Sequence, residues 1–328
     1  MHDLSCVVHL HSLHSDGTGT VEEIARAGAR AGVDVVLLTD HDTMEARSGW
    51  YGDVLVLVGV EVSPHRRDHY LAFGLDGPID HSGLSGSEIV RAVREAGGFG
   101  FAAHPFSRGS ERFRQAPMAW DDLSEVDGVE VWSFVSDLVE SVDSIPAALR
   151  FLRAPERSVH GPPEENLRRW DELNRSRRVV GIGGVDAHQF GKRLPGGVVL
   201  RLMGYARTFR QLRTHVWMEE LPTGELEHDR AQVFDALRAG RCYIAVDHLA
   251  PPAGFAFWAD ASGVHARVPR PASLRLLRDG AEVAQASGAA ELDLAADVPG
   301  SYRVEARLDG RVWILSNPLR VGPISDPS

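Results

Sequence analysis

The residues best suited to chemistry in this sequence are histidines and carboxylates that recur between positions 9 and 188. His9 and His11 are separated by one residue, and two such side chains on a β-strand point to the same side. Both imidazoles could therefore reach one metal ion. Asp186 and His188 repeat this spacing, with Asp186 two residues after a pair of glycines. The complete set of candidate metal ligands is His9, His11, Asp16, His41, Glu61, His69, His104, Asp186 and His188.

Nitrogen and oxygen ligands without a thiolate favour Zn²⁺, Mn²⁺ or Fe²⁺. Nine candidates are too many for one ion, so the sequence predicts two or three divalent ions that share carboxylates. Glu61 ends a wholly apolar run, where a buried and unpaired carboxylate would be costly, and metal ligation would remove that cost. Nine of the 15 histidines lie in the first 104 residues, which favours a cluster. Later histidines such as His215 are interpreted as ordinary surface or loop residues.

The elements that must position these side chains alternate in type along the chain. Apolar runs predict strands at residues 6–10, 33–38, 54–60, 98–103, 128–132 and 179–185. Helical spacing occurs at residues 21–32 and 87–96, and helices are also expected at 145–152 and 164–174. Buried strands that alternate with helices predict an α/β fold with a parallel sheet. The candidate ligands follow the strands, and the carboxyl ends of such strands are where α/β barrels build active sites.

The C-terminal part follows a different pattern. After Pro251 and Pro252 the chain shows short alternating runs, with Asp-Gly turn dipeptides at 279–280 and 309–310. We therefore predict a catalytic unit at residues 1–250 and a smaller antiparallel β-sandwich of immunoglobulin-like type at residues 251–328.

Composition narrows the classes of function. The chain has 328 residues and a net charge of −11, so its general field repels nucleic-acid polymers but admits a small anion beside bound cations. It has no apolar run of about 18 residues that would span a membrane, and no visible signal peptide. Two isolated cysteines are expected to be reduced, buried thiols. These features predict a cytoplasmic protein and leave its oligomeric state open.

The motifs HLHSLHSDG, LLTDHDT, VGVEVS followed by HYLAFG, FAAHP and GGVDAH together resemble the polymerase and histidinol phosphatase (PHP) family of metal-dependent phosphoesterases, over residues 6–190. The later AGRCYIAVD, followed by a β-rich tail, is similar to the CehA/McbA-like branch of that family. The resemblance implies a distorted (β/α)7 barrel. It assigns one ion to His9, His11, Glu61 and Asp186, a second to Asp16, His41 and His188, and a third to Glu61, His69 and His104.

The function that this resemblance implies is hydrolysis of a small, anionic phosphate monoester or diester by a hydroxide that bridges the metal ions. Asp186, Glu61 and His188 are the expected catalytic residues, with Asp186 as the acceptor of the water proton. Arg108, Lys192 and Arg193 are the candidates for binding the substrate phosphate.

Several alternatives stay open at this point. A carboxylic ester or carbamate could be hydrolysed on the same metal centre, since the CehA/McbA branch includes carbaryl hydrolase. The amidohydrolase superfamily also uses a His-x-His pair, but it does not account for the SDG, TDH and DxH motifs. The acidic charge disfavours a polymerase-associated exonuclease. A metal-binding module without catalysis is the non-enzymatic alternative, although such modules usually lose ligands.

Overall fold

The computed structural model describes residues 1–64, 68–111, 116–118, 120, 122–142, 144–154, 157, 160–189, 191–193, 199–201, 203–295 and 298–322. The strands in residues 1–184 are β1 (His2–Val8), β2 (Val35–Leu38), β3 (Gly49–Tyr51), β4 (Val54–Val58), β5 (Val60–Val62), β6 (Tyr70–Phe73), β7 (Phe99–Ala102), β8 (Gly128–Ser133) and β9 (Val180–Gly184). The later strands are β10 (Gly191–Arg193), β11 (Val199–Arg201), β12 (Arg213–Met218), β13 (Cys242–Ala245), β14 (Ala256–Asp260), β15 (Gly263–Arg278), β16 (Ala281–Leu294), β17 (Gly300–Leu308), β18 (Arg311–Ser316) and β19 (Leu319–Val321). The helices are α1 (Val21–Ala31), α2 (Gly86–Glu95), α3 (Phe134–Ser141), α4 (Ile145–Arg153), α5 (Glu164–Ser176), α6 (Tyr205–Thr208) and α7 (Leu226–Ala239).

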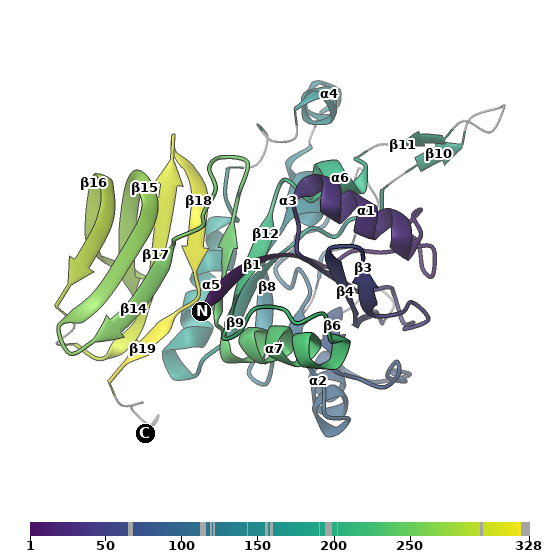
Figure 1. The fold of residues 1–328 in the computed structure, drawn as a ribbon, viewed down its shortest axis with the longest axis horizontal. Coiled ribbons are helices and arrows are strands. Elements are labelled where there is room, and N and C mark those ends of the chain that lie inside the picture. Colours follow the sequence, from purple (N-terminus) through teal and green to yellow (C-terminus); the bar gives the residue numbers. More distant parts are fainter. Residues whose placement is uncertain are drawn as a thin grey trace.

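The structure is a mixed α/β arrangement that is rich in sheet (Figure 1). In the described part of the chain, one sheet has twelve strands, with the path β14-β15-β17-β18-β13-β12-β1-β2-β4-β3 and two strands attached to its side, and another has the order β5-β6-β7-β8-β9. Strands β1, β2 and β4 are parallel, as are β7, β8 and β9, whereas β6, β12 and β13 pair antiparallel with their neighbours. The predicted parallel pairing is therefore confirmed for these strands, which precede most of the candidate ligands.

The distorted (β/α)7 barrel implied by the resemblance is not confirmed, because the ladders of the described residues do not form one continuous closed sheet. The two sheets meet instead at the carboxyl ends of their strands, through single bridging pairs between Leu10 and Ala187 and between His41 and Glu61. The amide of Val185 also donates to the carbonyl of Val8. These few bonds bring the ends of β1, β2, β5 and β9 together, which is what positions the site.

The apolar run at 54–60 forms two strands rather than the single strand predicted. β4 ends at Val58 and belongs to the larger sheet, whereas β5 begins at Val60 and belongs to the smaller one. Gly59 lies at the break, where an added Cβ would be 2.5 Å from the carbonyl oxygen of Ala72. A side chain there would clash with backbone, so glycine allows the chain to cross between sheets just before Glu61.

The helical predictions are confirmed at residues 21–32, 87–96, 145–152 and 164–174 to within a few residues. α1 shows why: Thr20 and Glu23 form a capping box, and Gly32 ends the helix in the left-handed conformation with φ of 70°. Its apolar stripe, which includes Ile24 and Ala27, packs into the main core.

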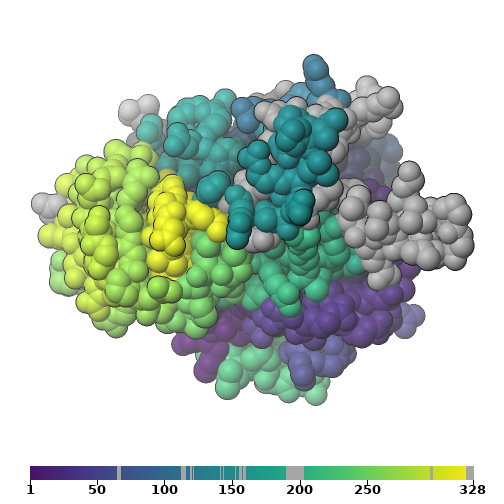
Figure 2. Space-filling view, turned by 90° about the horizontal axis from the view of Figure 1, so that it is seen from above, coloured from purple at the N-terminus to yellow at the C-terminus, as the bar shows by residue number. Residues whose placement is uncertain are grey.

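The C-terminal strands pair antiparallel, as predicted, and both Asp-Gly dipeptides form tight hairpin turns with positive φ at each residue. These strands are joined to the rest of the molecule. β18 pairs with β13 in the larger sheet, and the side chain of Asn317 bonds to backbone atoms of Gly181 and Cys242. Arg303 makes a bidentate ion pair with Asp171 of α5. Figure 2 shows the green and yellow C-terminal strands as one end of the molecule, against teal segments of its middle part.

Both cysteines are free and buried, as predicted. None of the helices in the described residues has the length and apolar character needed to cross a membrane.

His215 is not the surface residue that the sequence predicted. It lies on β12 with 5% of its surface exposed, and its two ring nitrogens contact Asp3 Oδ1 at 3.0 Å and Asp247 Oδ1 at 3.1 Å. Tyr243 donates to the other oxygen of Asp3, and Arg213 donates to the other oxygen of Asp247. Burial lowers the pKa of His215, but the two carboxylates outweigh it and raise that pKa to about 9.

The stability of the protein should therefore depend on pH through His215. Because its folded pKa is raised, the imidazolium stabilises the fold fully below pH 6.5, and this stabilisation is lost as the pH rises through about 9. The linkage corresponds to about 3 kcal/mol of unfolding free energy. Urea unfolding of wild type and His215→Gln at pH 6.5 and 9.5 should show a gap between the two proteins that narrows at the higher pH. A gap that is the same at both pH values would contradict the prediction.

Candidate metal centre

All nine candidate ligands lie in one continuous cluster at the meeting point of the two sheets. In its first group, His9 and His11 turn their Nε2 atoms toward two carboxylate oxygens. Glu61 Oε2 lies 3.3 Å from His9 Nε2 and 3.4 Å from His11 Nε2, and Asp186 Oδ1 lies 3.4 Å from both. Ligand atoms around a tetrahedral ion with bonds of about 2.1 Å are separated by about 3.4 Å. The four nitrogen-to-oxygen distances therefore match the spacing of ligand atoms around such an ion.

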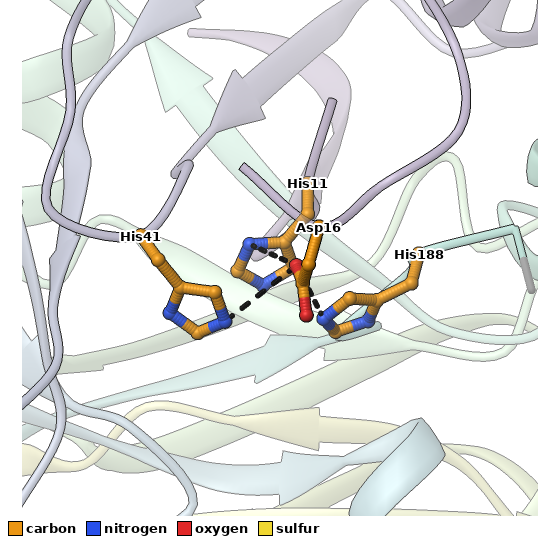
Figure 3. A group of neighbouring side chains, drawn as sticks. All are labelled: His11, Asp16, His41 and His188. Carbon is orange, nitrogen blue, oxygen red and sulfur yellow. Dashed lines mark ion pairs between the residues drawn. The ribbon is translucent and has the colours of Figure 1, made fainter. Parts of the chain in front are cut away.

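The second group surrounds Asp16, whose carboxylate is met by three imidazoles (Figure 3). Asp16 Oδ1 is 3.2 Å from His188 Nε2, 3.7 Å from His41 Nε2 and 3.9 Å from His11 Nδ1. His11 thus faces both groups, one with each ring nitrogen, which the sequence did not predict. Asp16 is the open side of this group, since 58% of its side chain is exposed.

The third group contains the other oxygen of Glu61. Glu61 Oε1 lies 2.9 Å from His69 Nδ1 and 3.5 Å from His104 Nε2. Glu61 therefore presents one oxygen to the first group and one to the third, as a bridging carboxylate would. His65, four residues before His69, is a second candidate for the same ligand position, and it lies outside the described residues.

Buried polar atoms in the cluster test whether it suits a metal. His9 Nε2, both ring nitrogens of His11 and Glu61 Oε2 are buried without a hydrogen-bond partner in the described part of the chain. Orphaned buried atoms of this kind are rare and costly in folded proteins, and here they converge on the same points. Divalent cations would supply the missing partners, so the residues present fit a metal centre.

The backbone is strained where it aims these side chains. His9, His104 and Asp186 have positive φ values of 65°, 32° and 49°. Non-glycine residues rarely adopt this conformation, and such strain tends to gather at functional sites. It places the three side chains at the ends of their strands facing the cluster.

No family model matches this sequence. Over 95 residues it is 33% identical to the phosphoribosyl 1,2-cyclic phosphate 1,2-diphosphodiesterase of Eggerthella lenta, a match that covers 26% of this chain. The chain spans 36% of the length of that curated relative. A two-domain protein of Bacteroides vulgatus that contains a predicted PHP-like metal-dependent phosphoesterase is similar at 15% identity, with 97% of this chain and 95% of that chain covered and a TM-score of 0.45. A candidate metal-dependent phosphoesterase of Bifidobacterium adolescentis is similar at 17% identity, over 62% of this chain and 94% of that one, with a TM-score of 0.34.

The proteins to which this chain is similar thus include a curated phosphodiesterase and PHP-like phosphoesterases, the kind of protein that the sequence motifs resemble. The narrower similarity to the CehA/McbA branch stays a prediction.

Glu130 is a functional candidate that the sequence analysis missed. This carboxylate is fully buried on β8, where Oε1 lies 3.0 Å from His9 Nδ1 and Oε2 accepts the backbone amide of His104 at 2.7 Å. A carboxylate behind a metal-binding histidine fixes the tautomer that leaves the other nitrogen free. The available signal was an acid inside the apolar run Gly-Val-Glu-Val-Trp.

Two other imidazoles are oriented in the same way. The hydroxyl of Ser63 uses its one proton to donate to the carbonyl of Glu61. The Nδ1 of His41 lies 2.7 Å from Ser63 Oγ, so it must be the donor in that second hydrogen bond. His188 Nδ1 lies 3.0 Å from the carbonyl of Asp186, which can only accept. Both rings therefore direct Nε2 toward Asp16.

Asp40 is not one of the candidate ligands, but it supports the loop that carries one of them. Its carboxylate accepts the amide and the hydroxyl of Ser12 and the hydroxyl of Ser15, each at 2.6 Å. It therefore holds the first half of the loop that carries Asp16. The acid before His41 was visible in the sequence, but its direction toward this loop was not.

The charges of the cluster interact strongly. Burial lowers the pKa of His11 to about 4, so this ring is neutral and able to bind a cation. Burial also opposes ionisation of Glu61 and Asp186, but the surrounding histidines, His9 foremost, hold the pKa of both carboxyls well below the usual range. The acids are therefore ionised and available as ligands.

Of the three residues predicted to bind phosphate, only Arg108 has a described side chain. Arg108 is described, with 82% of its side chain exposed and its Nε 3.1 Å from Glu140 Oε2. Its backbone amide also donates to Glu140 Oε1, and its role in binding phosphate stays a prediction. Lys192 and Arg193 lie on the short hairpin strand β10, and their side chains lie outside the described residues.

Proposed function

We propose that this protein is a metal-dependent hydrolase of small phosphate monoesters or diesters. The observation that carries the proposal is the convergence of nine His, Asp and Glu side chains in one cluster. At its centre, His9 Nε2, both ring nitrogens of His11 and Glu61 Oε2 are buried without a hydrogen-bond partner among the described residues. The match to a phosphodiesterase over part of the chain supports the choice of a phosphate ester.

We assign the first ion to His9, His11, Glu61 and Asp186. Asp16, His41 and His188 would hold a second ion, and Glu61, His69 and His104 a third. The distances within each group and the opposite directions of the two Glu61 oxygens support this assignment. Mn²⁺, Zn²⁺ and Fe²⁺ suit these ligands.

Ions bound in these groups would neutralise charge on a phosphoryl oxygen and lower the pKa of a water molecule. The protein's own residues then have separate tasks. Glu61 links two groups through its two oxygens, and His188 ties Asp16 to the segment that carries Asp186. The contacts of Asp186 with His9 and His11 run through Oδ1. Oδ2 of Asp186 is therefore the atom that we propose accepts the proton from the attacking water.

For the substrate we propose a small anion that reaches the cluster from the exposed side of Asp16. Arg108 is the described candidate for its phosphate, because its Nε pairs with Glu140 while 82% of its side chain is exposed. Residues 1–250 would form the catalytic unit, as a barrel opened between its two sheets. Residues 251–328 would support it through Asn317 and the Arg303–Asp171 ion pair.

The test is hydrolysis of a matched nitrophenyl panel by the Mn²⁺-loaded protein: phosphate monoester, phosphate diester, acetate and carbamate. We expect a preference for phosphate, loss of turnover to background when a chelator removes the ions, and recovery when Mn²⁺ is restored. A preference for acetate or carbamate would overturn the phosphate assignment and place the protein among carboxyl-ester hydrolases. Turnover that survives complete metal removal would overturn the metal centre as the source of catalysis.

A further inference from the structure

Tyr205 reaches the metal-binding loop from a distant part of the chain. It is buried on α6, and its hydroxyl donates to the carbonyl of His11 at 2.7 Å. The same oxygen accepts the backbone amides of Thr18 at 3.3 Å and Gly19 at 3.2 Å. A carbonyl can only accept and an amide N–H can only donate, so these roles are unambiguous. One hydroxyl thus uses its single proton and both lone pairs on a single loop.

This loop decides where Asp16 lies. It leaves β1 through His11 and returns at Gly19, which pairs with Leu13 through a backbone hydrogen bond. Asp40 holds its first half through Ser12 and Ser15, and Tyr205 holds its second half. Asp16 lies between the two anchors, and its own side chain is largely exposed. Its distance from His188 and His41 therefore depends on the loop backbone.

The ring of Tyr205 is closely fitted to this position. A Cβ added to Gly19 would be 2.5 Å from the ring, so a glycine is required for the loop to lie against it. The other side of the ring contacts Phe209. Removing the hydroxyl alone would leave this packing in place and would leave two loop amides without their acceptor.

We propose that Tyr205 is a positioning residue for the second ion, the one assigned to Asp16, His41 and His188. The proposal rests on the proposed function, because it concerns one ion of that centre. Tyr205 also bonds to the carbonyl of His11, a ligand assigned to the first ion, but the backbone of His11 is held by Ala187 as well. The first ion should therefore depend on Tyr205 less than the second ion does.

Tyr205→Phe tests this directly when metal-free protein is titrated with Co²⁺ and followed by visible absorption. Wild type should bind in separate steps. In the variant we expect the step for the second ion to weaken by about tenfold, the usual scale for a lost supporting partner, while the affinity of the tightest step changes much less. Turnover should fall at limiting Mn²⁺ and recover toward the wild-type value at high Mn²⁺.

Tyr302→Phe is the matched control. Tyr302 is also buried and donates to a carbonyl, that of Val298, but it lies in the C-terminal strands. If Tyr205→Phe loses only thermal stability, like this control, and both Co²⁺ steps are unchanged, the positioning role is overturned while wild-type turnover still supports the proposed function. Equal weakening of every step would also overturn it. Wild type that binds no Co²⁺ would remove both proposals.

Discussion

Asp186→Asn is expected to lower turnover of the preferred nitrophenyl ester by about 10²- to 10⁴-fold, the range that a positioned acid–base group contributes. Asparagine keeps the shape of aspartate, and its carbonyl oxygen can replace Oδ1 beside His9 and His11. Its amide group cannot accept a proton, and the charge is lost. Turnover and bound Mn²⁺ should be measured on the same preparation, with the first ion retained and the rate strongly reduced.

Asp229→Asn provides the matched control for this result. Asp229 is fully buried and accepts the backbone amides of Thr223 and Gly224 at the start of α7, away from the cluster. Its substitution should lower stability without a comparable loss of rate. If Asp186→Asn keeps wild-type turnover, Asp186 does not accept the proton and the proposed role is wrong.

Glu130→Gln is expected to reduce metal affinity by about 10- to 100-fold, the usual effect of losing the partner behind a metal-binding histidine. Glu130 accepts two hydrogen bonds, one from the ring N–H of His9 and one from the backbone amide of His104. A glutamine has one acceptor oxygen, so its amide group must face one of these donors and leave it unpaired in a buried site. Competition for Mn²⁺ with a chelator of known affinity measures the loss.

Glu305→Gln separates this effect from the loss of a buried charge in general. Glu305 is equally buried but pairs with Arg303, Arg275 and Arg307 among the C-terminal strands. We expect that variant to be destabilised while its metal affinity is unchanged. Metal affinity at the wild-type level in Glu130→Gln would show that His9 needs no carboxylate behind it.

The ligand set could be predicted from the sequence because short-range geometry is enough to suggest it. Alternation along a strand places His9 and His11 on one side, and parallel strands bring residues that follow them to one edge. The two-oxygen role of Glu61 followed from an acid at the end of an apolar run. To form the cluster, these positions then needed the ends of the strands to meet, which the bridging pairs between the two sheets achieve.

The supporting residues could not be predicted, because each acts across a long sequence separation. Glu130 lies 121 positions from His9, and Tyr205 lies 194 positions from His11. The burial of His215 between Asp3 and Asp247 is of the same kind.

The sequence by itself determined the candidate ligands, the helices with their caps and the Asp-Gly hairpins, since these depend on residue type, local spacing and turn conformation. Only the tertiary structure decided that the sheets meet through a few bridging pairs instead of closing. It also decided that the C-terminal strands continue the larger sheet and which side chains hold the ligands in place. These outcomes depend on which strand edges pair and which buried polar atoms find partners, and both are settled only when distant segments pack together.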